Sequence, residues 1–156
     1  MAREAFGYGD KEFVLVHHGI LHPNKGNDRI ISALSQIRVK LPSLRYLLVG
    51  DGPEMNRLRA QALKLGVSDI VQFTGWLPKM EDVNKALNAG DAGLVMRIGM
   101  PEDNFHITGA LVHAMACGLP ILAARLGGIS EIIRENENGL LFDPANMREF
   151  QERLMD

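Results

Sequence analysis

The feature that most constrains the fold of this sequence is a regular alternation between short apolar runs and longer amphipathic stretches. Six runs are rich in Val, Leu and Ile, and the residues between them place apolar side chains at helical spacing. The runs expected to form strands are 13–16, 45–49, 70–73, 93–96, 120–123 and 139–142. Apolar strands separated by helices predict a parallel sheet that is covered on both faces. The predicted fold class is therefore α/β, a Rossmann-like doubly wound parallel sheet of about six strands with helices on both faces.

Length and charge narrow the class of protein further. The length of 156 residues fits one domain, spanning 1–156. A net charge of −2 argues against a nucleic-acid-binding surface. No apolar run approaches the roughly 20 residues of a transmembrane segment, and the start of the chain has no apolar signal-peptide core. The only cysteine, Cys117, excludes an internal disulfide and favours a reducing, cytoplasmic compartment, and we interpret it as a small core residue.

Function is expected in the loops that follow the strands, because open parallel sheets bind ligands beyond the carboxyl ends of their strands. The first such loop contains Gly19, Gly26 and Lys25, and a helix is expected to begin directly after it. The N-terminus of a helix favours phosphate, and the lysine would add a full positive charge. The spacing matches neither the dinucleotide-binding glycine motif nor the P-loop. A surface turn with a solvated lysine is therefore an equal alternative.

Two further loops contain residues able to contact a nucleotide or a sugar. Trp76 either forms a wall for a planar base or packs in the core, and the residues alone leave both readings open. Glu102 and Asp103 precede a predicted helix, and their carboxylates can accept hydrogen bonds from sugar hydroxyls. His106 and His113 on that helix would lie about 10 Å apart, too far to ligate one metal ion. We therefore expect no metal site.

Six short segments stand in a fixed order along almost the whole chain. They are Pro23-x-Lys25-Gly26, Leu48-Val49-Gly50-Asp51-Gly52-Pro53-Glu54, Val71-x-Phe73-Thr74-Gly75-Trp76-Leu77-Pro78, Ala114-Met115-Ala116-Cys117-Gly118-Leu119-Pro120, Gly127-Gly128-x-x-Glu131-Ile132-Ile133 and Asn138-Gly139-Leu140-Leu141-Phe142. In this order and spacing the sequence resembles the C-terminal domain of the GT-B-fold glycosyltransferases in the large retaining family called glycosyl transferases group 1. One such segment would be a weak signal, but six in order are specific.

The resemblance implies that this domain is one half of a GT-B fold and binds a UDP-, GDP- or ADP-sugar as donor, with no metal or other cofactor. Lys25 matches the lysine that contacts the diphosphate, and Trp76 lies in the loop that binds the base. The residues assigned to the donor in this way are Gly19, Lys25, Gly75, Trp76, Leu77, His113, Gly127 and Gly128. Glu102 or Asp103 would be the first of the acidic residues at the catalytic cleft.

Two departures from the family pattern weaken the expected donor site. Ile20 stands where the family usually has an arginine, and the loss of a charge-assisted hydrogen bond costs about 1.5–3 kcal/mol. His113 stands where a glutamate holds the donor ribose, and an imidazole lacks the two acceptor oxygens of a carboxylate. The spacing from Asp103 to His113 also exceeds the family spacing. His22 is a speculative substitute for part of the missing charge.

The family's acceptor-binding N-terminal domain should precede this sequence, and we expect the chain to be an excised domain. The intact enzyme is then expected to transfer a sugar with retention to an unknown acceptor, while this domain alone transfers little because half of the cleft is missing. The main alternative is a non-catalytic Rossmann-like interaction or regulatory module with a degenerate donor site. A GT-B relative with another reaction, such as an epimerase or a sugar-phosphate synthase, is a further alternative.

Overall fold

The computed structural model describes residues 2–98 and 109–156. Its strands are β1 (Phe13–His18), β2 (Leu44–Val49), β3 (Val71–Phe73), β4 (Ala92–Val95), β5 (Ile121–Ala124) and β6 (Gly139–Phe142). Its helices are α1 (Ala2–Ala5), η1 (a 3-10 turn, Pro23–Lys25), α2 (Asn27–Ile37), α3 (Met55–Lys64), α4 (Met80–Asn88), α5 (Gly109–Ala116), α6 (Gly127–Ile132) and α7 (Met147–Met155). Each of the six predicted strands is present within a residue or two.

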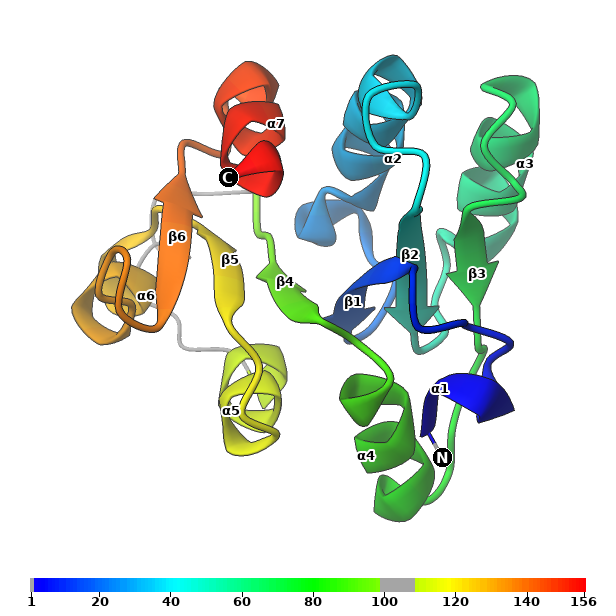
Figure 1. The fold of residues 1–156 in the computed structure, drawn as a ribbon, viewed down its shortest axis with the longest axis horizontal. Coiled ribbons are helices and arrows are strands. Elements are labelled where there is room, and N and C mark those ends of the chain that lie inside the picture. Colours follow the sequence, from blue (N-terminus) through cyan, green and yellow to red (C-terminus); the bar gives the residue numbers. More distant parts are fainter. Residues whose placement is uncertain (1, 99–108) are drawn as a thin grey trace.

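All strand pairs are parallel, and the strands follow the order β3-β2-β1-β4-β5-β6 across the sheet (Figure 1). The first three strands extend the sheet in one direction, and the chain then returns to place β4 on the other side of β1. This is the doubly wound order, whose switch point lies between β1 and β4. The predicted fold class is confirmed.

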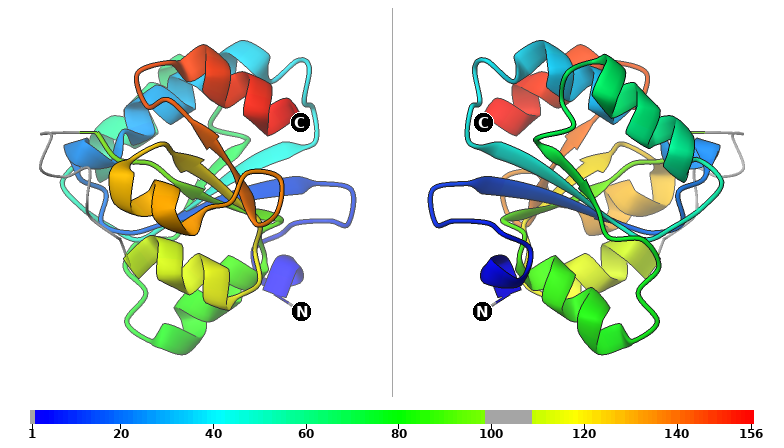
Figure 2. Two further views of the ribbon diagram at one scale, coloured as in Figure 1. Left: turned by 90° about the vertical axis from the view of Figure 1, so that its left-hand side faces the viewer. Right: turned by 90° about the vertical axis from the view of Figure 1, so that its right-hand side faces the viewer.

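Helices cover the sheet on both faces, with α2, α3 and α7 on one side and α1, α4 and α5 on the other (Figure 2). The alternation of side chains along the strands explains this arrangement. Leu15 and Leu48 point into the larger core cluster, which also contains side chains of α2, α3 and α7. Val14 and Val16 point into the smaller cluster with the buried residues of α4. Both faces of the central strands are therefore apolar, as the continuous runs predicted.

Two local details differ from the predictions. The short helix α1 was not expected, because four residues are too few to show a periodicity. Its Arg3 side chain donates a hydrogen bond of 2.9 Å to Asp91 and one of 3.2 Å to the carbonyl of Ala89, which ties α1 to the end of α4. Pro53 suits the first position of a helix, but α3 begins two residues later, at Met55. The intervening amide of Glu54 instead donates 2.9 Å to the carbonyl of Leu21 in the loop after β1.

Cys117 was predicted to be a small core residue. It is half-buried rather than fully buried and packs against the smaller core cluster. It follows α5 at the end where the chain turns toward β5. The prediction of a packing role therefore holds in a weaker form.

Candidate functional site

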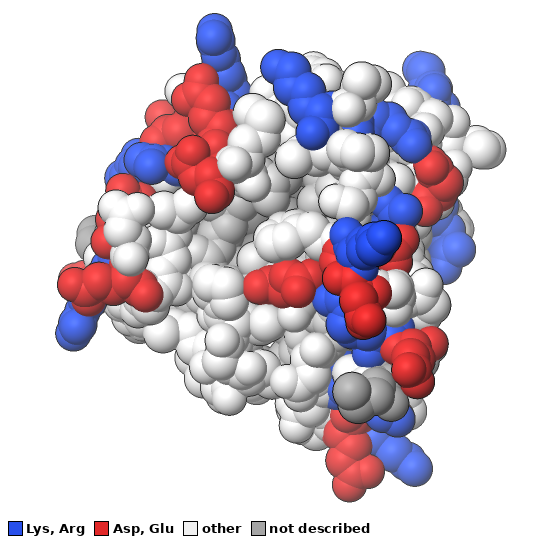
Figure 3. All heavy atoms as spheres, viewed as in Figure 1, with Lys and Arg blue, Asp and Glu red and all other residues white. Residues whose placement is uncertain are grey.

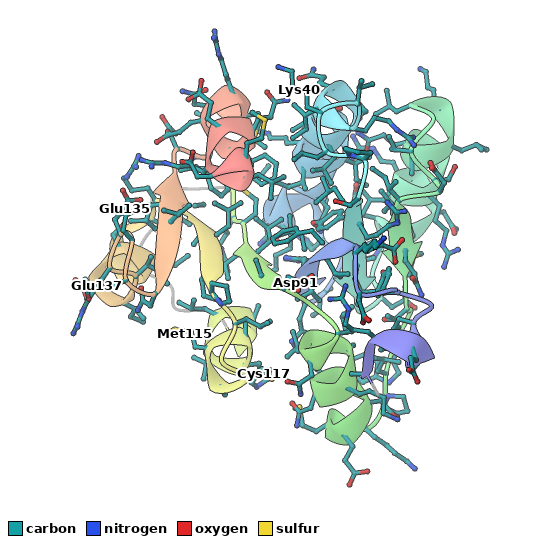
Figure 4. The ribbon with its side chains drawn as sticks, viewed as in Figure 1. Lys40, Asp91, Met115, Cys117, Glu135 and Glu137 are labelled. Atoms are coloured by element: carbon teal, nitrogen blue, oxygen red, sulfur yellow. The ribbon has the colours of Figure 1, made fainter. Side chains whose placement is uncertain are left out.

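An apolar groove with a volume of about 460 Å³ lies at the amino ends of the strands. Figure 3 shows a hollow bordered mainly by uncharged atoms on this face. Its walls include Phe13, Ala92 and Ile121, each at the start of a strand. Asp91, labelled on the same face in Figure 4, has a structural task, since its carboxylate accepts 2.8 Å from the amide of Val14 in addition to the bond from Arg3. This edge of the sheet is opposite to the one where doubly wound folds bind ligands.

A second cavity, of about 220 Å³, lies at the carboxyl ends of β1 and β2 and beside the loop after β3. Its lining residues are His18, Gly19, Ile20, Val49, Gly50, Asp51, Trp76, Leu77, Pro78, Met80 and Val83. Three loops that are distant in the sequence thus meet at the edge where a ligand is expected. We call this space the carboxyl-edge cavity.

The floor of the carboxyl-edge cavity is two backbone turns in close contact. The amide of Leu21 donates 2.9 Å to the carbonyl of Asp51, and the Asp51 carboxylate accepts 2.7 Å from the amide of Gly52. A Cβ atom on Gly50 would lie 2.2 Å from the carbonyl oxygen of Gly19, and Gly50 has a φ of +139°. The Gly50-Asp51-Gly52 segment is therefore a tight turn, and the close approach of the two turns requires glycine at position 50.

Trp76 forms an exposed wall of the cavity. Its side chain is 71 % exposed, so the alternative that it packs in the core is wrong. Ile20 and Met80 line the same cavity and are 62 % and 54 % exposed. An exposed aromatic face next to two apolar side chains can stack against a planar ring.

Besides the pairing of β1 with β4, two contacts connect the chain at or after β1 with the chain at or after β4. The amide of Ile98 donates 2.7 Å to the carbonyl of Asn24, and Nδ1 of His17 lies 3.3 Å from the carbonyl of Leu94. His17 is 1 % exposed, and burial together with the nearby positive charge of Lys25 lowers its pKa to about 4. His17 is therefore neutral near pH 7. Lys25 is half-buried at the end of η1 and close enough to act on this histidine.

His113 reaches the site through an unpredicted contact. From α5 it stacks on His18, with ring centroids 5.4 Å apart and ring planes 23° apart. His18 lines the carboxyl-edge cavity, and its pKa is lowered by burial and by the nearness of His113. The sequence pattern placed His18 at a strand end, but nothing in it indicated that α5 would bring a second imidazole alongside.

The remaining predicted site residues lie elsewhere. Gly75 directly precedes Trp76, whereas Gly127 and Gly128 begin α6 after β5 and are not in the cavity lining. Glu102 and Asp103 fall outside the described residues. In the part of the chain that the structure describes, no group of three or more His, Cys, Asp or Glu residues is placed to hold a metal ion. None of the described helices is both long and apolar enough to cross a membrane.

The strand order and the position of this cavity define a Rossmann-like domain of the kind that forms one half of a GT-B glycosyltransferase. The family model described as "Glycosyl transferases group 1" matches residues 2–156, and the chain belongs to this family. Members of the family are enzymes that transfer sugars, and several relatives of this chain are named glycosyltransferases. The resemblance inferred from the six segments is thereby confirmed.

Two relatives and two solved structures illustrate the similarity. The chain is 33 % identical to a GDP-mannose-dependent alpha-(1-6)-phosphatidylinositol monomannoside mannosyltransferase of Mycolicibacterium smegmatis, over 93 % of this chain and 38 % of the relative. It is 29 % identical to the putative glycosyltransferase EpsD of Bacillus subtilis, over 97 % of this chain and 38 % of the relative. The chain thus spans well under half of the length of these relatives.

Among solved structures, Anabaena Alr3699/HepE in complex with UDP-glucose matches with a TM-score of 0.80 and 29 % identity. The match covers 96 % of this chain and 40 % of that one. The C-terminal domain of a glycosyl transferase group 1 family protein (LpcC) from Francisella tularensis matches with a TM-score of 0.81 at 18 % identity. That match covers 99 % of this chain and 78 % of the other, and at this identity it supports the fold alone.

Proposed function

We propose that this chain binds the nucleotide diphosphate of a sugar donor and forms the donor half of a retaining glycosyltransferase. The observation that carries the proposal is the convergence of Gly19, Trp76 and Leu77 on one cavity at the carboxyl edge of the sheet. The base is proposed to stack on Trp76, and Gly75 to allow the turn that presents it. A relative that depends on GDP-mannose and a similar structure that contains UDP-glucose support a nucleotide-sugar donor.

The proposed diphosphate contact is Lys25, which ends η1 just before the N-terminus of α2. A full positive charge there adds to the free N–H groups and the positive dipole end of the helix. Gly127 and Gly128, at the start of α6, are proposed to border the sugar side of the cleft. Glu102 or Asp103 is proposed as the acidic residue at the reacting sugar, on the resemblance alone. The proposal needs no metal or other cofactor.

The acceptor is proposed to bind a second, N-terminal domain of the whole enzyme, because this chain matches only 38 % of the length of its first relatives. Transfer requires donor and acceptor to be held together in reactive geometry. We therefore expect these residues alone to bind a nucleotide but to transfer little sugar. The lone Cys117 supports a cytoplasmic location.

Lys25→Ala tests the diphosphate contact. Removal of a charge-assisted hydrogen bond should cost about 1.5–3 kcal/mol, so affinity should fall about 10- to 150-fold. Calorimetric titration with UDP, GDP and ADP measures this loss and identifies the preferred base. Lys40→Ala is the matched control, because exposed Lys40 follows the far end of α2, about 16 Å from Lys25 along the helix. Failure of all three nucleotides to bind the unaltered chain at millimolar concentration would contradict the proposal.

Trp76→Ala tests the base wall. Stacking of a base on an aromatic ring is worth about 1–3 kcal/mol, which corresponds to a loss of affinity of about 5- to 150-fold. Since the side chain is 71 % exposed, the free energy of unfolding should change by less than about 0.5 kcal/mol. Trp76→Phe keeps an aromatic face and should recover most of the affinity. Equal binding by the Ala and Phe variants would show that the base does not stack at this position.

A second candidate is a non-catalytic module with a degenerate donor site. It is favoured by Ile20, an exposed apolar side chain at the position of the family's usual arginine, and by His113. The same titration separates the two functions. Nucleotide affinity that depends on Lys25 supports the donor site, and its absence in the full-length protein supports the module.

A further inference from the structure

The stacked pair of His18 and His113 is a polar feature at the proposed donor site that has no structural explanation. His18 ends β1 and His113 lies on α5, so two separate elements bring the rings to a centroid distance of 5.4 Å. Nδ1 of each ring is buried and has no hydrogen-bond partner among residues 2–98 and 109–156. A buried polar atom without a partner costs free energy, so the pair is stabilised by a proton or a hydrogen-bonding ligand that reaches these nitrogens.

The pair adjoins the proposed donor site. His18 lines the carboxyl-edge cavity next to Gly19 and Ile20, and Ile20 holds the position where the family usually has an arginine. The cation expected at this point is therefore missing, and a protonated imidazole beside it would restore one positive charge.

The surrounding charges determine when the pair can hold a proton. His17 of β1 is buried and neutral near pH 7, Lys25 of η1 is cationic, and Asp51 of the β2–α3 turn lines the cavity that His18 faces. Burial and His113 both disfavour the charged form of His18 and lower its pKa. Two positive charges on stacked rings repel each other, so the pair accepts one proton far more readily than two.

We propose that the His18–His113 pair is a proton-coupled contact for the donor diphosphate, neutral in the free protein and singly protonated when a nucleotide sugar is bound. The inference rests on the proposed donor-binding function. The proton comes from solvent, and no covalent bond forms or breaks. The negative diphosphate favours the charged form of a nearby imidazole, and the imidazolium supplies the cation that Ile20 lacks.

The sign of the pH dependence follows from this coupling. Donor binding favours the protonated form of the pair, so the bound state holds more protons than the free state. Affinity should then increase as the pH falls through the range in which the bound pair takes up its proton, and it should become constant once the free pair is also protonated. Between pH 8 and pH 6 we expect about tenfold tighter binding, within the limit of tenfold per pH unit for one proton.

The experiment is calorimetric titration with UDP-glucose, GDP-mannose and ADP-glucose at pH 7, repeated in PIPES and Tris. These buffers differ in ionisation enthalpy, so the dependence of the binding heat on the buffer gives the number of protons taken up. Nucleotide sugars are the appropriate probes, because the terminal phosphate of a free nucleotide itself titrates at a pKa of about 6. We expect uptake of about half to one proton per donor bound.

His113→Gln keeps a hydrogen-bonding side chain but cannot be protonated, and it should abolish the proton uptake and flatten the pH dependence. Lys40→Ala is the control, because Lys40 is exposed beyond the far end of α2 and should leave the uptake in place. Circular dichroism checks that both variants fold. In the unaltered chain, the imidazole NMR signals of His18 and His113 should shift to the protonated form on donor binding at constant pH.

Donor binding without proton uptake would overturn this inference and leave the proposed function intact. Uptake that survives His113→Gln, or that is lost in Lys40→Ala instead, would also overturn it. If no nucleotide sugar binds, the proposed function and the inference both fail.

Discussion

Gly50→Ala should destabilise the protein by more than about 3 kcal/mol, which is a large part of the roughly 5–15 kcal/mol that stabilises a typical domain. The new Cβ atom would lie 2.2 Å from the carbonyl oxygen of Gly19, and this backbone cannot move without breaking the contact between the turns after β1 and β2. The φ of +139° adds backbone strain for any residue with a side chain. Urea denaturation, followed by circular dichroism, measures the loss.

Gly66→Ala separates the steric clash from the strain. Gly66 also has a positive φ, of +69°, but a Cβ atom there would meet no atom within 4 Å. This variant should lose only the strain of about 1–2 kcal/mol. If Gly50→Ala were no more destabilising than Gly66→Ala, the close approach of the two turns would not exist in solution.

Leu58→Ala should cost about 2.7–5 kcal/mol of unfolding free energy, because it removes a side chain that is 1 % exposed and leaves a cavity between α3 and the sheet. The same helix provides the control. Leu63→Ala makes an identical chemical change at a position that is 72 % exposed, and it should alter stability by less than about 0.5 kcal/mol. Similar losses in both variants would contradict the packing of α3 described here. Thermal or urea unfolding of the two variants under the same conditions measures both losses of unfolding free energy.

The strands could be predicted from the sequence because their signal is local. Runs such as 13–16 and 139–142 are apolar throughout, and a buried strand between two helical layers fits that pattern and length. The order of the strands in the sheet could not be predicted in this way. Whether β4 lies beside β1 or beside β3 depends on contacts between residues far apart in the chain, and no local pattern encodes it. The start of α3 shows the same limit on a small scale, since a tertiary hydrogen bond from Glu54 to Leu21 delays the helix by two residues after Pro53.

The candidate site could be predicted as a set of loops but not as a set of contacts. The rule that ligands bind at the carboxyl ends of parallel strands selected the loops that contain Gly19, Gly50 and Trp76, and all three residues line one cavity. Met80 and Val83 were missed, because both belong to α4 and reach the cavity only through the packing of that helix. The stacking of His113 on His18 was missed for the same reason.

The central position of β1 has a consequence for how the protein is made. Within this domain β1 is synthesised before the other strands, and it pairs with β2 on one side and with β4, 77 residues later at Leu15 and Ala92, on the other. Until the ribosome has produced β4, a nascent sheet of β3, β2 and β1 would leave β1 as an open edge strand, and such edges attract other chains. Closure of this edge also brings α5 and β4 to the site. Nascent chains that end before β4 should therefore need a chaperone more than those that include it, and they should have no donor affinity.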